Sequence, residues 1–157
     1  MRQLDSHGDT IVEVLLAILV VSTILGGAFV SARRSQTGIR GTQERVEALK
    51  VAEAQIERIR AIAKSSASST LYANPVTFCI DTGNTKQAAT LRTLATENFA
   101  NTTWHPAGCN SQPAGGVTYY TVTQRTAADN TFTVYTRWDG VGGSGRQEVQ
   151  LSVRMDP

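Results

Sequence analysis

The sequence predicts an α+β fold in which one long N-terminal helix precedes a small antiparallel β-sheet. Three observations support this class. Residues 11–30 form an apolar run with a single ionisable residue, Glu13. A charged segment follows in which apolar residues recur three and four positions apart, the spacing of an amphipathic helix. Beyond residue 116 the pattern changes to the twofold alternation that is typical of strands.

Length and charge limit the possible classes of protein. The chain has 157 residues, of which 41% are hydrophobic, and its 15 basic and 13 acidic residues give a net charge of +2. This length allows one domain with a modest core. The near balance of charge gives no electrostatic signature of a nucleic-acid or acidic partner. Nucleic-acid binding is therefore possible but unsupported.

The apolar run is long enough to cross a membrane. Twenty helical residues at about 1.5 Å each span roughly 30 Å, the thickness of a bilayer's hydrocarbon core. We expect four parts in the chain: a short polar leader, a transmembrane helix, an amphipathic continuation of that helix and a globular domain. Their expected ranges are 1–8, 9–32, 33–64 and 65–157.

The continuation of the helix is predicted to carry one apolar stripe and to end near Lys64. The serine-rich residues 65–69 follow, and serine favours caps and turns over helix interiors. The stripe consists of six residues: Val46, Leu49, Ala52, Ile56, Ile59 and Ala63.

Three segments near the C-terminus predict an antiparallel meander. They are rich in Val, Thr, Tyr and Phe, and turn residues separate them. Their ranges are 117–124, 131–138 and 146–155. The intervening region is less regular: residues 71–80 can hold a strand, and residues 85–100 a short helix.

The two cysteines, Cys79 and Cys109, lie in turn-rich sequence. They can form one disulfide, worth roughly 3–4 kcal/mol for a loop of this length. Two buried free thiols are the alternative. Together with His105, the cysteines lack the paired spacing of a zinc site. We expect no metal, no cofactor and no enzymatic activity, because no nucleophile or ligand constellation accompanies His105.

Two polar features of the C-terminal region have plain interpretations. Residues 139–145 contain one carboxylate and no phosphate-binding motif, so they predict a hairpin loop rather than a calcium or phosphate site. Four arginines, at positions 125, 137, 146 and 154, lie in or directly beside the predicted strands. We expect them on solvated strand faces.

The stretch from Gly8 through Asp9, Thr10, Ile11, Val12 and Glu13 into the apolar run resembles the processing signal of type IV pilins and pseudopilins. The resemblance implies a pilin-like α+β fold. It implies that a prepilin peptidase cleaves after Gly8, that Asp9 becomes the methylated N-terminus, and that Glu13 directs subunit assembly. Asp9 departs from the family, in which phenylalanine is usual at this position.

Residues 131–155 resemble the C-terminal hairpin of V- and I-type minor pilins, in which a strand ending in Trp-Asp leads through a glycine-rich turn to a last strand. The resemblances imply a minor subunit of a type IV pilus or pseudopilus, with other pilin subunits and a membrane assembly platform as partners. The chain would be single-pass in the membrane before assembly and part of a surface filament afterwards.

Other interpretations of the N-terminal segment remain open. Thr10 and Glu13 fit a helix capping box, which is compatible with assembly. Val30, Ser31 and Ala32 resemble a secretory cleavage site. The chain could then be a single-span anchored or secreted binding domain unrelated to pili, although this alternative leaves Gly8 and Glu13 unexplained.

Overall fold

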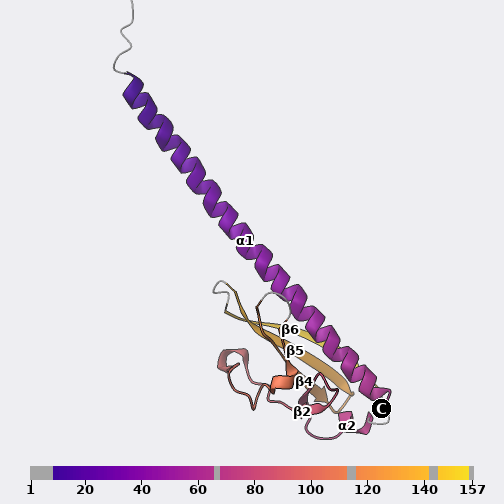
Figure 1. Ribbon diagram of the computed structural model, residues 1–157. Helices are drawn as coiled ribbons and strands as arrows, with labels where there is room; N and C mark the ends of the chain where they lie inside the picture. The colour runs from indigo at the N-terminus through magenta and orange to yellow at the C-terminus, as the bar shows by residue number, and fades with distance from the viewer. Residues whose placement is uncertain (1–8, 66–67, 113–115, 142–144, 156–157) are drawn as a thin grey trace, which may run out of the picture. The chain divides into compact units, whose positions relative to one another are not determined.

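The structure, a computed structural model, describes residues 9–65, 68–112, 116–141 and 145–155. It confirms the predicted α+β class: a long N-terminal helix, α1 (Asp9–Ala63), packs on a small antiparallel sheet in a pilin-like layout. Figure 1 shows α1 as one uninterrupted helix. The chain divides into two compact units, Met1–Ile39 and Arg40–Pro157.

The second unit contains the sheet, the C-terminal part of α1 and three short helical segments. The remaining elements are α2 (Ser68–Tyr72), β1 (Thr77–Ile80), β2 (Lys86–Ala88), η1 (Leu94–Thr96), η2 (Ala107–Cys109), β3 (Asn110–Ser111), β4 (Tyr119–Thr126), β5 (Thr131–Gly140) and β6 (Gly145–Arg154). Both η segments are 3-10 helices. The peptide bond between Asn74 and Pro75 is cis.

The sheet has six strands in the order β2-β1-β4-β5-β6, and β3 pairs with the start of β4. All pairings are antiparallel. The predicted meander is confirmed as β4, β5 and β6. Strand β1 confirms the strand that was expected within residues 71–80.

The short helix predicted within residues 85–100 is wrong. Residues 86–88 instead form β2, which pairs with β1, and only η1 is helical. The physical reason is tertiary: Glu97 is 2% exposed and binds groups on the sheet. The side chains of this segment therefore serve the sheet and do not form the apolar face of an independent helix.

The buried face of α1 differs slightly from the predicted stripe. Ala52, Ile56 and Ile59 are buried as predicted, but Val46 is 46% exposed. At this end of the stripe, Glu44 and Ala48 are buried instead. The predicted stripe is wrong at this end because the carboxylate of Glu44, and not an aliphatic side chain, makes the contact with the β5–β6 hairpin.

Glu44 fixes α1 to the β5–β6 hairpin. Its carboxylate accepts hydrogen bonds from the Trp138 indole and from the Val141 backbone N–H, each at 3.0 Å. The Tyr119 hydroxyl donates to the Glu44 carbonyl at 3.2 Å. Buried Trp and Tyr usually need such partners, so one helical residue holds two strands.

The core between α1 and the sheet has two apolar clusters. The larger is centred on Ile59 and Phe132, and the smaller on Ala48 and Trp138. Beside the larger cluster, the amide of Gln55 pairs with the backbone of Ile80: its nitrogen donates to the carbonyl at 3.1 Å, and its oxygen accepts from the N–H at 2.6 Å. Gln55 thus satisfies both backbone groups at the end of β1.

The burial pattern predicts a contrast between two residues of α1. Ile59→Ala removes a fully buried side chain and should lower the free energy of unfolding by about 2–5 kcal/mol. Val46→Ala should change it by less than about 0.5 kcal/mol. Urea denaturation in detergent tests this, and equal losses for the two variants would contradict the observed orientation of the helix.

Candidate functional site

The first half of α1 exposes an unbroken apolar surface. Every residue from Ile11 to Gln43 is exposed, and the apolar side chains of the run, such as Ile11 at 71% and Leu15 at 62%, are uncovered in this single chain. Among the described residues, α1 is the one helix long and apolar enough to cross a membrane. A patch this large normally marks an interaction site.

Charge is confined to the two ends of this surface. Glu13 lies near its start, and Arg33 and Arg34 follow its end. The guanidinium of Arg33 lies 4.6 Å from the centroid of the Phe29 ring, the last aromatic residue of the run. Within the described residues Glu13 has no ion-pair partner.

The other residues of the predicted processing site are only partly described. Gly8 and the leader lie outside the described residues. Asp9 is the first residue of α1. Glu13 therefore lies four residues, about one helical turn, beyond the first helical residue.

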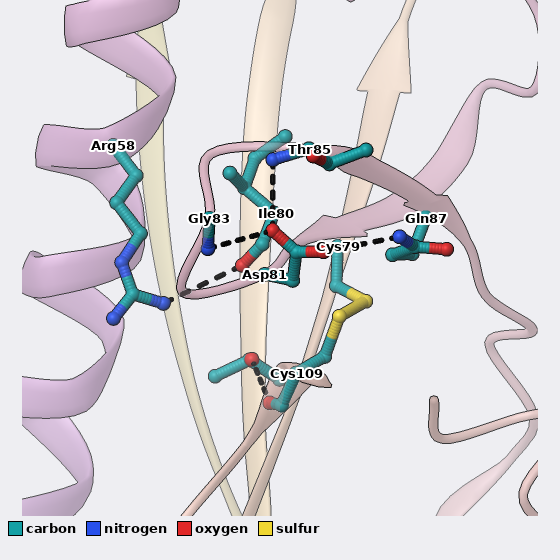
Figure 2. Close-up of a disulfide and its surroundings, with 9 residues drawn as sticks. Arg58, Cys79, Ile80, Asp81, Gly83, Thr85, Gln87 and Cys109 are labelled. Carbon is teal, nitrogen blue, oxygen red and sulfur yellow. Dashed lines mark hydrogen bonds between the residues drawn. A yellow bond between two sulfur atoms is a disulfide. The ribbon is translucent and has the colours of Figure 1, made fainter. Parts of the chain in front are cut away.

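Cys79 and Cys109 form a disulfide, as the sequence suggested. Their Cα atoms are 6.0 Å apart, and both residues are buried (Figure 2). The bond joins β1 to the end of η2, and the Thr121 hydroxyl of β4 donates to the Cys109 carbonyl at 2.7 Å. The segment between helix and meander is thereby tied to the sheet at two points.

Asp81 orders the turn that follows the first cysteine (Figure 2). Its Oδ1 accepts hydrogen bonds from the backbone N–H groups of Thr85 at 2.8 Å and Gly83 at 2.9 Å, and its Oδ2 accepts from Gln87 at 3.0 Å. The Thr85 bond is the main reason that the pKa of Asp81 lies below its usual value. A Cβ at Gly108 would lie 2.9 Å from the Asp81 Cβ, so this close approach requires glycine.

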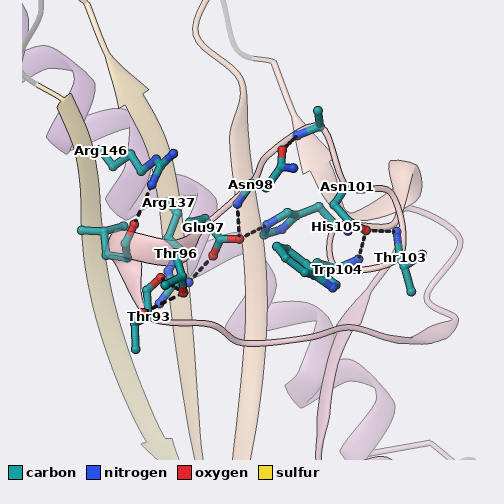
Figure 3. Close-up of polar contacts among 12 residues, drawn as sticks. Thr93, Thr96, Glu97, Asn98, Asn101, Thr103, Trp104, His105, Arg137 and Arg146 are labelled. Atoms are coloured by element: carbon teal, nitrogen blue, oxygen red, sulfur yellow. Dashed lines mark hydrogen bonds and ion pairs between the residues drawn. The ribbon is translucent and has the colours of Figure 1, made fainter.

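A buried ionic cluster lies on the face of the sheet opposite α1. We call Glu97, His105, Arg137 and Glu148 the Glu97 cluster. Glu97 accepts from His105 Nε2 at 2.8 Å and contacts Arg137 (Figure 3). The Nε of Arg137 donates to Glu148 at 2.6 Å. Exposed side-chain fractions are 0% for Glu97, 1% for His105 and 4% for Arg137.

The Glu97 cluster corrects the prediction that Arg137 is solvated. Alternation along β5 does place Arg137 on the face away from α1, but residues 94–105 cover that face. The His105 ring packs 5.0 Å from Tyr120 and 5.6 Å from Phe99, between ring centroids. Residues 94–105 have neither strand nor helix periodicity, so the sequence gives no signal that this segment buries Arg137.

Burial would raise the pKa of Glu97, but the hydrogen bonds from His105 and Arg137 outweigh it, so the pKa lies below its usual value. The folded protein then binds fewer protons at this carboxyl than the unfolded chain does. The stability that Glu97 contributes is present above its unfolded pKa of about 4.3. It is lost as the pH falls through the lower folded value.

The described residues contain no group of three or more His, Cys, Asp or Glu side chains that could hold a metal ion. A groove of about 260 Å³ with mixed polar and apolar lining lies between α1 and β3, with Lys50, Arg58 and Asn110 among its lining residues. Its lining combines opposite charges and shows no catalytic arrangement. The exposed apolar half of α1 is therefore the strongest candidate for a functional surface.

Comparison of the chain with models of known protein families, with curated proteins and with solved structures gives no match.

The Glu97 cluster generates a pH prediction. Glu97→Gln should lower the free energy of unfolding at pH 7 by about 3–5 kcal/mol, because it leaves a buried guanidinium without a full counter-charge. It should also flatten the loss of stability below about pH 4.3. The measurement is urea unfolding at several pH values, with the exposed Glu53→Gln as control. A mutant curve parallel to that of the wild type would contradict this role.

Proposed function

We propose that this chain is a minor structural subunit of a type IV pilus or related pseudopilus, assembled through α1 after removal of the leader. The observation that carries the proposal is the placement of Glu13. Its carboxylate lies within an apolar helical surface that is exposed from Ile11 to Val30. The alternative, an ordinary membrane anchor, has no use for this charge.

The energetics of Glu13 favour a partner in another subunit. An unpaired charge in the hydrocarbon is unfavourable, by about 2.5–3.5 kcal/mol at the centre of a spanning helix, and Glu13 lies near the end of the run, close to where the new N-terminus would be. Cleavage after Gly8 would create a positive amine at Asp9, one helical turn away. Two such helices, displaced along their axes, can pair the carboxylate of one with the amine of the other. Attraction between the two charges is strong where water is excluded.

Axial displacement gives the proposed pairing a structural consequence. If the two groups of one chain satisfied each other, nothing would set the distance between neighbouring chains. Pairing between chains fixes a register, and burial of the apolar helices against one another then stabilises it at about 25 cal/mol per Å² of apolar surface. The same surface that holds the subunit in the membrane would thus hold it in the filament.

The second half of α1 supports the proposal in a different way. From Glu44 onward the helix has a buried face, and Gln55 and the apolar core fix it to the sheet. The first half offers apolar surface outward and the second half offers it to the chain's own sheet. This division suits a helix that must serve both an assembly and a globular domain.

The proposal implies specific partners and locations. A prepilin peptidase would process the chain in the membrane, and an assembly platform would transfer it into a filament of other pilin subunits. The hairpin of β5 and β6 favours a minor subunit, through its resemblance to V- and I-type minor pilins. The bonds from Trp138 and Val141 to Glu44 give this hairpin a defined place on α1.

Gly8 should be required for processing. A peptidase must bring the bond after Gly8 into its active site beside the membrane, and Gly8→Leu would add a side chain at the cleaved bond. Immunoblots of membranes should show the variant at precursor size, and Gly26→Ala should mature normally. Mature-size Gly8→Leu protein would contradict the proposed cleavage site.

Glu13→Gln should be processed but enter filaments poorly. The amide keeps the shape of the side chain and removes the charge that would answer the neighbour's amine. In the membrane the variant should be at least as stable, because a neutral amide costs less in hydrocarbon than a carboxylate. The assay compares membrane and sheared-filament fractions, and we expect a loss of at least about tenfold, or 1.4 kcal/mol, from the filament fraction.

Thr23→Val is the matched control for this assay, because it removes an exposed polar group of the same helix without changing charge. It should enter filaments at the wild-type level. If Glu13→Gln is recovered equally in that fraction, Glu13 does not direct assembly and an ordinary anchor becomes the better interpretation.

A further inference from the structure

Strand β6 lies at one end of the sheet and has a regular free edge. All ten of its residues pair with β5 in consecutive register, from Gly145 opposite Gly140 to Arg154 opposite Thr131. Among the described residues no strand pairs with its other side. Exposed edges of this length are ready templates for another strand, and proteins usually shorten, interrupt or cover them.

The opposite end of the sheet shows the usual protection. Strand β2 has three residues. Its first residue, Lys86, donates to the carbonyl groups of Ala73 at 2.6 Å and Thr70 at 3.0 Å, which places the loop after α2 beside this edge. The two edges of the sheet therefore differ in length: one is a strand of three residues, and the other is a regular strand of ten.

One backbone hydrogen bond shows which groups of β6 point outward. The N–H of Met155 donates to the carbonyl of Asn130 at 3.2 Å, continuing the β5–β6 register. Backbone groups of successive residues in a strand point to opposite sides. The odd-numbered residues of β6 therefore bond to β5, and the even-numbered residues direct their N–H and C=O groups to the free edge.

Side-chain burial agrees with this assignment of an open edge. Gln150 and Ser152 are exposed. Near the start of the strand, Arg146 donates to the carbonyl groups of Ala95 at 2.9 Å and Leu94 at 3.2 Å. Between Glu148 and Ser152, no described strand pairs with this edge.

The apolar residues of β6 are incompletely covered. Leu151, Val153 and Met155 pack against the larger core cluster but are only partly buried. An added strand with apolar residues opposite them would complete this layer. On the other face it would meet Gln150 and Ser152, which suit polar neighbours.

We propose that the free edge of β6 is a docking site for an extended, amphipathic strand of a different polypeptide, which would add to the sheet as a seventh strand. Main-chain hydrogen bonds would supply affinity, and the alternation of apolar and polar residues would set the register. The apolar residues of the incoming strand lie on the side of Leu151 and Val153.

A second copy of the chain is the competing occupant, and the reason for rejecting it rests on the proposed function. Antiparallel pairing of two β6 strands in one continuous sheet requires a two-fold axis normal to that sheet. Such an axis reverses the direction of α1 in the second copy. Subunits anchored in one membrane or stacked in one filament must have their helices pointing the same way.

The test uses the protein purified from its native membrane in detergent and a synthetic ten-residue peptide that alternates valine and serine. Directly opposed residues of paired strands share a face, so the serines should lie opposite the even-numbered residues of β6. N-methyl groups on the valine amides leave one hydrogen-bonding edge free and prevent the peptide from stacking on itself. A control peptide carries the N-methyl groups on the serine amides and lacks that edge.

The readout is residue-resolved amide hydrogen exchange. The first peptide should slow exchange at Glu148, Gln150 and Ser152 by about tenfold or more, whereas odd-numbered amides stay protected throughout. The control peptide should have no effect. Unchanged exchange at the even-numbered amides with the first peptide overturns the proposal, and protection that grows with protein concentration alone establishes a second copy as the occupant.

Two substitutions of Ser152 make the test independent of peptide design. Ser152→Pro removes an outward N–H and leaves the ladder to β5 intact, since proline is tolerated on the solvent side of an edge strand. Ser152→Ala keeps the N–H. Binding should be lost in the first variant and kept in the second, with protected odd-numbered amides showing that both fold. Equal binding by both variants overturns the proposal.

This experiment and the proposed function can fail separately. No filament is needed for the exchange measurement, so absence of peptide binding leaves pilus assembly untouched. The intact mass of the same sample reports the N-terminus of the mature chain. An uncleaved leader would refute the proposed function without changing the measured accessibility of the β6 edge.

Discussion

The exposed apolar half of α1 is the constraint on which the account depends. Residues 11–30 are part of one continuous helix, yet no other described part of the chain covers their side chains. At about 25 cal/mol per Å², leaving this surface in water is strongly unfavourable. A membrane or other helices must supply the cover, and Glu13 is the one ionisable group of the run that can make the choice of neighbour specific.

The globular domain holds its share of α1 with few but varied contacts. The larger apolar cluster packs around Ile59. Glu44 binds the backbone of the β5–β6 hairpin, and Gln55 binds the backbone of β1. On the other face of the sheet a disulfide, the buried Glu97 cluster and the stacking of Phe99 on Tyr120 fix the covering segment. This arrangement orders a segment whose own sequence has no regular period.

The long helix and the meander could be predicted because their periodicity is local and repeated. The apolar stripe predicted for α1 was correct at Ala52, Ile56 and Ile59 and wrong at Val46, because the neighbouring contact is made by the carboxylate of Glu44. The prediction that Arg137 is solvated was wrong because residues 94–105 cover it. Its partner in that segment, Glu97, lies forty positions earlier in the sequence. Contacts between polar residues that are distant in the sequence leave no periodic signal. Local sequence patterns therefore predict the helix and the strands, but they do not predict the side chains that connect them.

The central claim is that α1 becomes an assembly helix by proteolytic exposure of a new N-terminus one turn before Glu13. The intact mass of the protein isolated from its native membrane tests this claim most directly, because it reads the N-terminus and its modification together. The account predicts a chain that begins at Asp9 and carries one added methyl group. A chain that begins at Met1, or near Arg33 after cleavage by a secretory peptidase, would contradict it.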